Sequence, residues 1–386
     1  MLSEYDFEAA IPTAHSHTSF LFISQDNLLR NLHVLRQHIS VPIMAVIKNN
    51  GYGLGLSAYT ALLYGQGIRD FGLIDCRDAL ILAARYPLAT FYLLAPAADP
   101  DLLCAMIRCG NIVLHVGNER DLELLRIAQR RTGKQARVQL KLDTGFGRYG
   151  FLPNQLQNVL QAAQLFTLDG IYTHFSEPYA DASFTKKQFS LFMQLLSNLQ
   201  SRGIRPRLRH CCASGAALNY SQMHLDMVRI GAAIIGSVPN REDYGLQQVC
   251  RYYAKLISCK RLPDGWRIGY GRHTTLHHST QVGILQAGAM AGCFITRQES
   301  GVNPLRYFYR GFRACFHPKK LYAEIAGQSV PILGTIGMNH LAIDLSRCTA
   351  KIGDFALLPI NPAFCPASLP RLFGSELLQE ELSCKN

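Results

Sequence analysis

The chain has 386 residues, of which 48% are hydrophobic and 17% are charged. This composition supports a large apolar core and excludes a disordered or low-complexity protein. The net charge of +12 is compatible with anionic ligands, but the basic residues are scattered and no nucleic-acid-binding motif accompanies them. We therefore expect a solvated basic surface and no nucleic-acid partner.

The twelve cysteines lack the spacing of metal ligands, so we expect reduced thiols and no metal site. The N-terminal residues show neither a basic region nor an apolar run of a signal peptide, and no run reaches membrane-spanning length. These observations predict a soluble, cytoplasmic protein without a membrane partner.

From residue 41 onward, short apolar runs alternate with amphipathic stretches whose apolar residues recur every three or four positions. This alternation is typical of parallel βαβ units, and eight such runs favour a closed barrel over an open sheet. The predicted strands are 41–47, 71–74, 90–94, 111–116, 136–142, 168–173, 207–212 and 226–230. We predict an α/β protein whose residues 20–242 form a (β/α)8 barrel of the TIM type.

After about residue 243 the pattern changes to strand-like segments separated by Gly, Pro and Asp turns. One helix is conceivable within 303–316, but none of comparable length separates the other segments. Residues 243–386 are therefore predicted to form a mainly β domain. The early apolar run 19–24 precedes the first barrel strand and is a candidate to join this second domain.

Polar residues follow or end several of the predicted barrel strands. In such barrels, chemistry is built at the C-terminal ends of the strands. The residues at these positions are Lys48, Lys141, Arg148, His174, Ser214, Arg229 and Gly231. Their convergence on one face suits a phosphate-bearing ligand held beside a lysine that can form a Schiff base.

Six motifs in order make the pattern specific. AVIKNNGYGLG, KLDTGFGRYGF, YTHFSEP, DMVRIGAAIIG, GYGRHTT and ILGTIGMNHLAIDLS resemble the alanine racemase family in order and spacing, from about residue 20 to about 375. The resemblance implies pyridoxal 5'-phosphate (PLP) as cofactor, a small amino acid as substrate, a homodimer, and interconversion of L- and D-amino acids.

For the cofactor, the resemblance implies that Lys48 forms the Schiff base and also acts as the base for one face of the substrate α-carbon. Tyr52, Ser214 and the backbone of Gly231 and Ala232 would hold the phosphate.

For the ring and the substrate, the resemblance implies that Arg229 faces the pyridine nitrogen and that His174 supports it. Arg148 would lie near the phenolic oxygen and the substrate carboxylate, supported by Lys141, which is carbamylated in many relatives. Taken singly, these residues have structural interpretations too: a solvent-facing lysine, surface arginines, a core histidine, and glycines that only make turns.

The C-terminal part departs from the family pattern. Racemisation uses one base on each face of the α-carbon, and in the family the second base is a tyrosine of a G-Y-x-D-G motif contributed by the partner subunit. The corresponding QAGAMAGCF has Ala289 at the tyrosine position and Ala291 at the aspartate position. Asn339 follows Met338 where the family has Asp, Ala213 replaces an Asn, and a late phosphate-contacting Tyr is lost near Ala367.

Three hypotheses follow from this departure. The protein is a racemase in which another group, among Cys293, His340, Tyr307 and Tyr309, replaces the tyrosine. Alternatively, it is a one-base PLP enzyme that catalyses aldol cleavage, decarboxylation or condensation. The third possibility is a non-catalytic PLP-binding protein.

Overall fold

The computed structural model describes residues 16–295, 308–309, 311–312 and 320–375. Contacts divide the chain into two compact units, Leu28–Gln248 and Met1–Asn27 with Val249–Asn386. No described helix is long and apolar enough to cross a membrane. The ten cysteines within the described residues are all free thiols.

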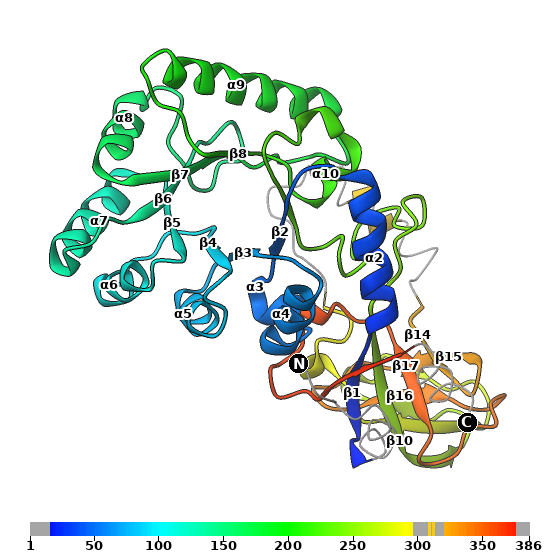
Figure 1. Cartoon of the computed structure of the whole chain (residues 1–386). Helices are drawn as coiled ribbons and strands as arrows, with labels where there is room; N and C mark the ends of the chain where they lie inside the picture. The colour runs from blue at the N-terminus through cyan, green and yellow to red at the C-terminus, as the bar shows by residue number, and fades with distance from the viewer. Residues whose placement is uncertain (1–15, 296–307, 310, 313–319, 376–386) are drawn as a thin grey trace. The chain divides into compact units, whose positions relative to one another are not determined.

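The first unit contains an eight-stranded parallel sheet with strand order β8-β7-β6-β5-β4-β3-β2-β9 (Figure 1). A parallel bridge between Ala213 and Arg229 joins the end of β8 to β9 and closes the circle. The predicted eight-stranded barrel is therefore confirmed. Its strands are β2 (Ile43–Val46), β3 (Asp70–Leu73), β4 (Thr90–Leu93), β5 (Ile112–Val116), β6 (Arg137–Lys141), β7 (Thr167–Tyr172), β8 (Leu208–His210) and β9 (Val228–Ile230).

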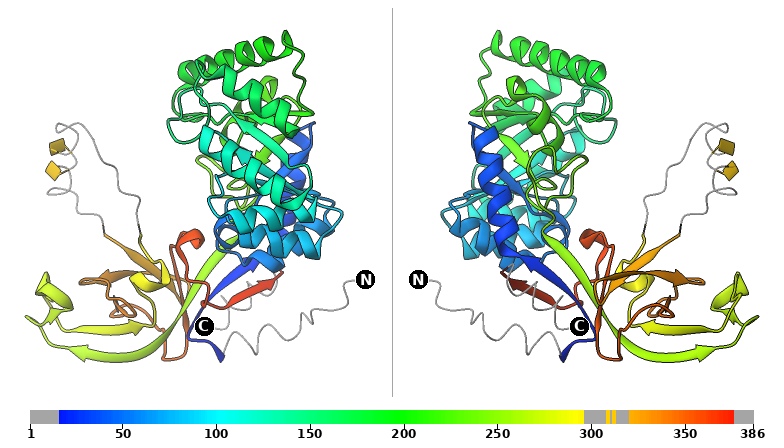
Figure 2. Two further views of the ribbon diagram at one scale, coloured as in Figure 1. Left: turned by 90° about the vertical axis from the view of Figure 1, so that its left-hand side faces the viewer. Right: turned by 90° about the vertical axis from the view of Figure 1, so that its right-hand side faces the viewer.

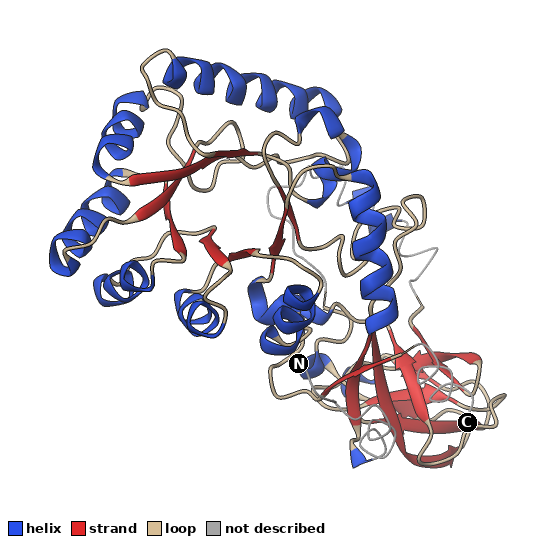
Figure 3. Ribbon diagram, in the orientation of Figure 1, coloured by secondary structure: helices blue, strands red, loops and turns tan. Residues whose placement is uncertain are grey.

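Helices surround these strands on the outside (Figure 3). They are α2 (Gln25–His38), α3 (Lys48–Tyr52), α4 (Leu56–Gly65), α5 (Cys76–Arg85), α6 (Pro100–Cys109), α7 (Glu119–Thr132), α8 (Leu156–Leu165), α9 (Ala182–Gln200) and α10 (Ser214–Asn219), with the short 3-10 turn η2 (Ser221–Met223).

Helix α6 shows how the local sequence sets the helix boundaries. The Asp99 side chain accepts hydrogen bonds from two backbone amides of the first turn, and Pro100 occupies the first helical position. Gly110 ends the helix in the left-handed conformation. Leu103 and Met106 are three residues apart and buried, so one face of the helix packs inward.

The barrel interior is divided between an apolar and a polar part. Met44, Tyr92, Val113 and Met227 form a buried cluster from β2, β4, β5 and the approach to β9. Buried polar residues come mainly from β5 to β9, namely His115, Gln139, Lys141, His210 and Arg229. Because barrel interiors are normally filled by branched aliphatic side chains, this polar sector indicates a functional role.

The second unit is built on an eight-stranded sheet with order β13-β16-β15-β14-β17-β10-β1-β18. β1 (Ser19–Ser24) pairs antiparallel with β10 and parallel with β18, so the prediction that 19–24 joins the β domain is confirmed. The other strands are β10 (Cys250–Leu262), β11 (Arg267–Ile268), β12 (Thr274–Thr275), β13 (Thr280–Leu285), β14 (Tyr322–Ile325), β15 (Gln328–Leu333), β16 (Leu341–Asp344), β17 (Phe355–Leu358) and β18 (Arg371–Gly374).

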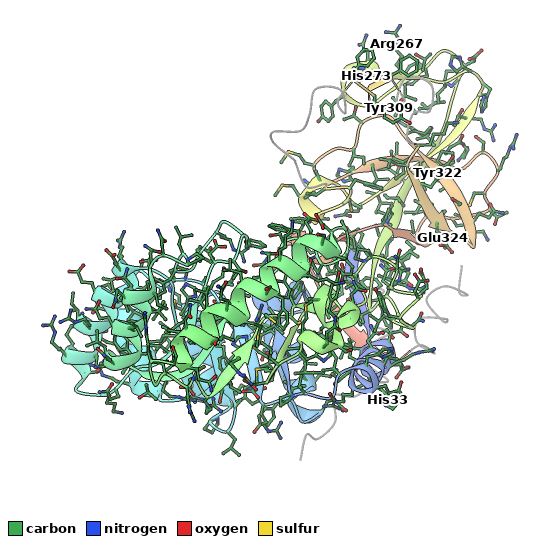
Figure 4. All side chains as sticks on the ribbon, turned by 90° about the horizontal axis from the view of Figure 1, so that it is seen from above. His33, Arg267, His273, Tyr309, Tyr322 and Glu324 are labelled. Carbon is green, nitrogen blue, oxygen red and sulfur yellow. The ribbon has the colours of Figure 1, made fainter. Side chains whose placement is uncertain are left out.

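The long strand β10 runs through the whole second unit and pairs with β1, β13 and β17 (Figure 2). Strand β14 shows the alternation expected of a half-buried sheet, because Tyr322 and Glu324 are exposed whereas Ala323 and Ile325 are buried (Figure 4). The helix predicted within 303–316 lies mostly outside the described residues.

Candidate active site

The loop that follows β2 coincides with the short element α3, begins with Lys48 and has an unusual backbone conformation at the residues after this lysine. Asn49, Asn50 and Tyr52 have φ angles of 54°, 54° and 55°, in the left-handed region that non-glycine residues rarely adopt. The Asn50 side chain accepts a hydrogen bond from the Leu56 amide at 2.8 Å, which ties the loop to the start of α4. Lys48 Nζ lies 5.7 Å from the centre of the Tyr52 ring. A strained loop fixed in this way is typical of a functional site.

Tyr52 packs directly against the loop after β9. A Cβ atom built on Gly231 would lie only 2.5 Å from Tyr52 Oη, so any larger residue at this position would displace the tyrosine side chain. The Gly231 and Ala233 amides donate to Ser214 Oγ at 3.3 and 3.2 Å. The Ala232 amide between them donates to no protein acceptor within the described residues. The tyrosine, the serine and this backbone turn thus form one small cradle.

Arg229 is buried and is held entirely by neutral acceptors. Its Nη1 atom donates to His210 Nδ1 at 2.7 Å and to the His210 carbonyl at 3.2 Å. Its Nη2 atom donates to the carbonyls of Thr173 and Cys211 at 2.8 and 3.0 Å and lies 3.3 Å from His174 Nδ1. The expected contact between Arg229 and His174 is present, and His210 makes the shorter one.

Both histidines beside Arg229 are neutral. Burial, followed by the charge of Arg229, holds the pKa of His174 and of His210 well below the usual value. Because an arginine can only donate, the Nδ1 atoms that face it accept and the proton is on Nε2 in His210. Burial also lowers the pKa of Arg229, although an arginine still stays charged.

Lys141 and Arg148 lie close to the same two aromatic rings. The Lys141 ammonium is 5.6 Å from the Phe146 ring and 5.2 Å from the Tyr149 ring, and the Arg148 guanidinium is 4.5 and 5.2 Å from them. Burial and the nearby Arg148 charge lower the pKa of Lys141 to about 8, against an opposing effect of Asp143. The Lys141 amine is therefore partly uncharged near neutral pH.

Asp143 organises the loop between Lys141 and Arg148. Its carboxylate accepts hydrogen bonds from the amides of Gly145, Phe146 and Gly147 at 2.8, 2.8 and 2.9 Å. The Phe146 ring meets His174 edge-on at 5.0 Å, which links this loop to the Arg229 group. Asp143 was not among the residues predicted from the sequence, although an Asp two residues before a Gly is a recognised signal for a turn in which the Asp side chain accepts hydrogen bonds from the following amides.

The assembled site carries excess positive charge. No carboxylate of the described residues lies within ion-pair distance of Arg229, Lys141 or Arg148. Buried cations that lack carboxylate partners are costly unless an anion compensates them. The chemistry of these donors and the cradle around Gly231 suit a ligand that has a phosphate group and a carboxylate.

The residues named in the C-terminal part lie in the second unit. Ala289 and Ala291 belong to the 3-10 turn η4 (Ala289–Ala291), whose Ala289 amide donates to the Gly337 carbonyl at 3.0 Å. Cys293 is buried, and burial raises the pKa of its thiol to about 12. His340 is exposed.

Of the two tyrosines considered as substitutes, Tyr309 is 63% exposed. Tyr307 lies outside the described residues.

Comparison with known proteins identifies the family. Residues 23–239 match the family model described as alanine racemase, N-terminal domain, and residues 249–362 match alanine racemase, C-terminal domain. The chain belongs to the alanine racemase family. Enzymes of this family use PLP, with which the phosphate cradle and the cationic site are compatible.

Individual relatives extend the match over most of the chain. The chain is similar to an alanine racemase of Chlorobaculum tepidum, with 28% identity over 376 residues that cover 93% of this chain and 91% of that protein. An alanine racemase of Desulforamulus reducens is 33% identical over 282 residues, covering 70% and 75%. The crystal structure of alanine racemase from Streptomyces lavendulae superposes with a TM-score of 0.79 at 25% identity, covering 92% and 97%.

Proposed function

We propose that this protein is a PLP-dependent racemase that interconverts the L and D forms of alanine or a related small amino acid. The observation that carries the proposal is the buried Arg229, held by neutral acceptors at the same end of the barrel as Lys48 and the Ser214 cradle. The family relationship supports it, because the similar proteins are named alanine racemases. We also propose a homodimer in the cytoplasm, as expected from the family and from the free cysteines.

The cradle would bind the cofactor phosphate. The Tyr52 and Ser214 hydroxyls lie beside the turn after β9, which contributes the amides of Gly231 and Ala232. Backbone amides and hydroxyls of this kind are common phosphate ligands. The Ala232 amide, with no protein acceptor in the described part of the chain, is the donor that a phosphate oxygen would satisfy.

Arg229 would face the ring nitrogen of the cofactor. When bound, PLP supplies an electron-withdrawing ring that acidifies the substrate α-proton. A permanent positive charge at Arg229 opposes protonation of the ring nitrogen and keeps the ring a moderate electron acceptor. This favours return of a proton to the α-carbon over transfer of electrons elsewhere, as a racemase requires.

Three side chains would act on the substrate. Lys48 would hold the cofactor and, when released by the substrate, remove or return the proton on one face of the α-carbon. Arg148, which is exposed at the loop held by Asp143, would bind the substrate carboxylate. Lys141 would support Arg148 by packing against the same two aromatic rings, Phe146 and Tyr149, and His174 would support Arg229.

Racemisation also requires a base on the other face of the substrate α-carbon. We propose that the second unit of a partner copy supplies it. Burial disfavours the Cys293 thiolate, whereas the His340 side chain is exposed and carries an imidazole that can transfer protons. His340 is therefore the better candidate of the two.

A one-base PLP enzyme is the second candidate function. Ala289 places a methyl group where the family tyrosine is expected, and it is exposed on η4. A methyl group cannot transfer protons, and its small size leaves room for a second substrate or a departing fragment. Aldol cleavage, decarboxylation or condensation would use that room.

Deuterium exchange tests the proposal. In D2O, a racemase should incorporate deuterium into both alanine enantiomers and interconvert them. A one-base enzyme should exchange only one enantiomer, with conversion at least about 10²-fold slower than exchange, because loss of a general base typically costs 10²–10⁴-fold. If both enantiomers exchange, His340→Ala should abolish one of the two exchanges, and Cys293→Ala serves as the matched control. Absence of all exchange, on alanine and on a panel of small amino acids, would contradict the racemase.

A further inference from the structure

His115 is a buried histidine that the proposed reaction does not use. It lies on β5 and is 3% exposed. Its Nδ1 atom is 2.8 Å from the Tyr172 hydroxyl on β7. Because β6 lies between β5 and β7 in the sheet, this hydrogen bond spans a whole strand.

The surroundings of His115 determine which nitrogen carries the proton. Burial, together with the charges of Lys141 and Arg148, lowers its pKa to about 3, so the ring is neutral. Its Nε2 atom makes no hydrogen bond within the described residues and lies 3.8 Å from Asp121 Oδ2, the oxygen that accepts the Gly117 amide at 2.9 Å. The negative charge of the Asp121 carboxylate favours a proton on Nε2, which leaves Nδ1 as the acceptor for the Tyr172 hydroxyl.

Tyr172 connects this hydrogen bond to Arg229. The Tyr172 and His210 rings are parallel, with centroids 5.1 Å apart and an interplanar angle of 0°. The Arg229 guanidinium lies 5.3 Å from the Tyr172 ring centre. When the hydroxyl of a phenol donates a hydrogen bond, electron density on its oxygen and ring increases. This strengthens the attraction between the ring and a nearby cation.

Neutral groups alone hold Arg229, because no carboxylate pairs with it in the described residues. Its orientation is set by carbonyls, by His210 and by the Tyr172 ring. We propose that His115 is a positioning residue for Arg229, acting through the hydroxyl and ring of Tyr172. The inference rests on the proposed function, in which Arg229 faces the cofactor nitrogen.

A pH titration of the cofactor absorbance band tests the inference without measuring activity. In protein reconstituted with PLP, the midpoint reports protonation at the Lys48 nitrogen. His115→Leu should move it upward by about 0.5 pH units, because a less restrained Arg229 exerts a weaker positive potential. His115→Gln can accept from Tyr172 and donate toward Asp121, so it should keep the wild-type midpoint.

A double-mutant cycle separates positioning from core filling. Tyr172→Phe keeps the ring and removes only the hydroxyl, and it should shift the midpoint in the same direction. Adding His115→Leu to Tyr172→Phe should then change the midpoint by less than about 0.1 pH units. His33→Leu, on the outer surface of α2, is the matched control and should change nothing (Figure 4). No shift in His115→Leu, or an equal shift in both backgrounds, would overturn the inference.

The cofactor-free protein gives an independent readout. Nitrogen-15 spectra should show His115 neutral, with the proton on Nε2, from about pH 5 to 8. A protonated ring or an Nδ1–H tautomer would overturn the inference even if the cofactor never binds. Failure of PLP to produce any absorbance band would instead contradict the proposed function.

Discussion

The basic residues at the two ends of the barrel differ in whether a carboxylate pairs with them. Strand β6 has one basic residue of each kind. Arg137 begins the strand and makes two hydrogen bonds to Asp169, at 2.8 and 2.9 Å, while Arg207 approaches the same carboxylate at 2.9 Å. These hydrogen bonds raise the pKa of Arg137. Lys141 ends the same strand, and burial lowers its pKa to about 8. The cations at one end are paired with a carboxylate of the protein, whereas those at the other end are not.

This difference separates stability from function. At the N-terminal end, paired charges help to hold β6, β7 and the approach to β8 together. At the C-terminal end, Arg229 and Lys141 are buried without carboxylate partners in the described residues, which costs stability in the free protein. An anionic cofactor and substrate would recover that cost on binding.

The largest effect on stability is expected from removing the ion pairs at the N-terminal end of the barrel. Asp169→Asn should lower the free energy of unfolding by about 3 kcal/mol, because two arginines lose a buried carboxylate partner. Burial raises the pKa of Asp169, but the hydrogen bonds and charges of Arg137 and Arg207 together outweigh this effect and lower it. Its stabilisation is therefore present above the unfolded pKa and lost as the pH falls through the folded one.

Urea unfolding at neutral and acid pH measures this effect, and the wild type and the variant should converge in acid. PLP affinity under native conditions should not change. A variant as stable as wild type at neutral pH would show that the ion pairs do not stabilise the barrel.

A smaller effect, on PLP affinity, is expected from adding a methyl group to the cradle at the C-terminal end of the barrel. Gly231→Ala should weaken PLP binding by about 10- to 100-fold, because the new methyl group displaces the Tyr52 hydroxyl at a cost of about 1–3 kcal/mol. Gly65→Ala adds the same group where no atom lies within 4 Å and is the matched control. Equal PLP affinity in both variants, measured by equilibrium titration, would mean that the cradle does not hold the phosphate.

The smallest effect concerns Lys141 in the cofactor-free protein. Its folded pKa of about 8 lies below the usual lysine value of 10.5, so between these pH values the unfolded chain binds more protons. Stability should therefore rise with pH in this window, by about 1 kcal/mol between pH 8 and pH 9. Lys141→Met should abolish the rise and be more stable than wild type at pH 7. The control Lys134→Met, at an exposed lysine, should keep the pH dependence. A rise that persists in Lys141→Met would assign it to another group.

The sequence predicted the barrel strands because each is a short apolar run bounded by turns, a pattern that depends only on neighbouring residues. It also placed Lys48, Lys141 and Arg229 at one end, since strand polarity in a parallel barrel determines where each strand ends. It did not identify Ala233 at the cradle or His210 as the shorter contact of Arg229. Those contacts depend on how loops from different strands meet, which local patterns do not encode.

His115 and Asp143 were missed for a related reason. A histidine in an apolar strand looks the same in sequence whether it is a core residue or part of a polar network. Only the β5-to-β7 hydrogen bond distinguishes the two. The roles of Cys293 and His340 stay predictions, because both lie in the second unit and would act in a partner copy.

Covalent trapping on Lys48 tests the central claim most directly. The reconstituted protein should absorb near 420 nm, about where PLP imines absorb, and borohydride should fix the label irreversibly. Peptide mapping should find the label on Lys48, and Lys48→Ala should abolish it while the exposed-site control Lys134→Ala leaves it unchanged. A label on another lysine, or none after reconstitution, would contradict the assignment of this end of the barrel as a PLP site.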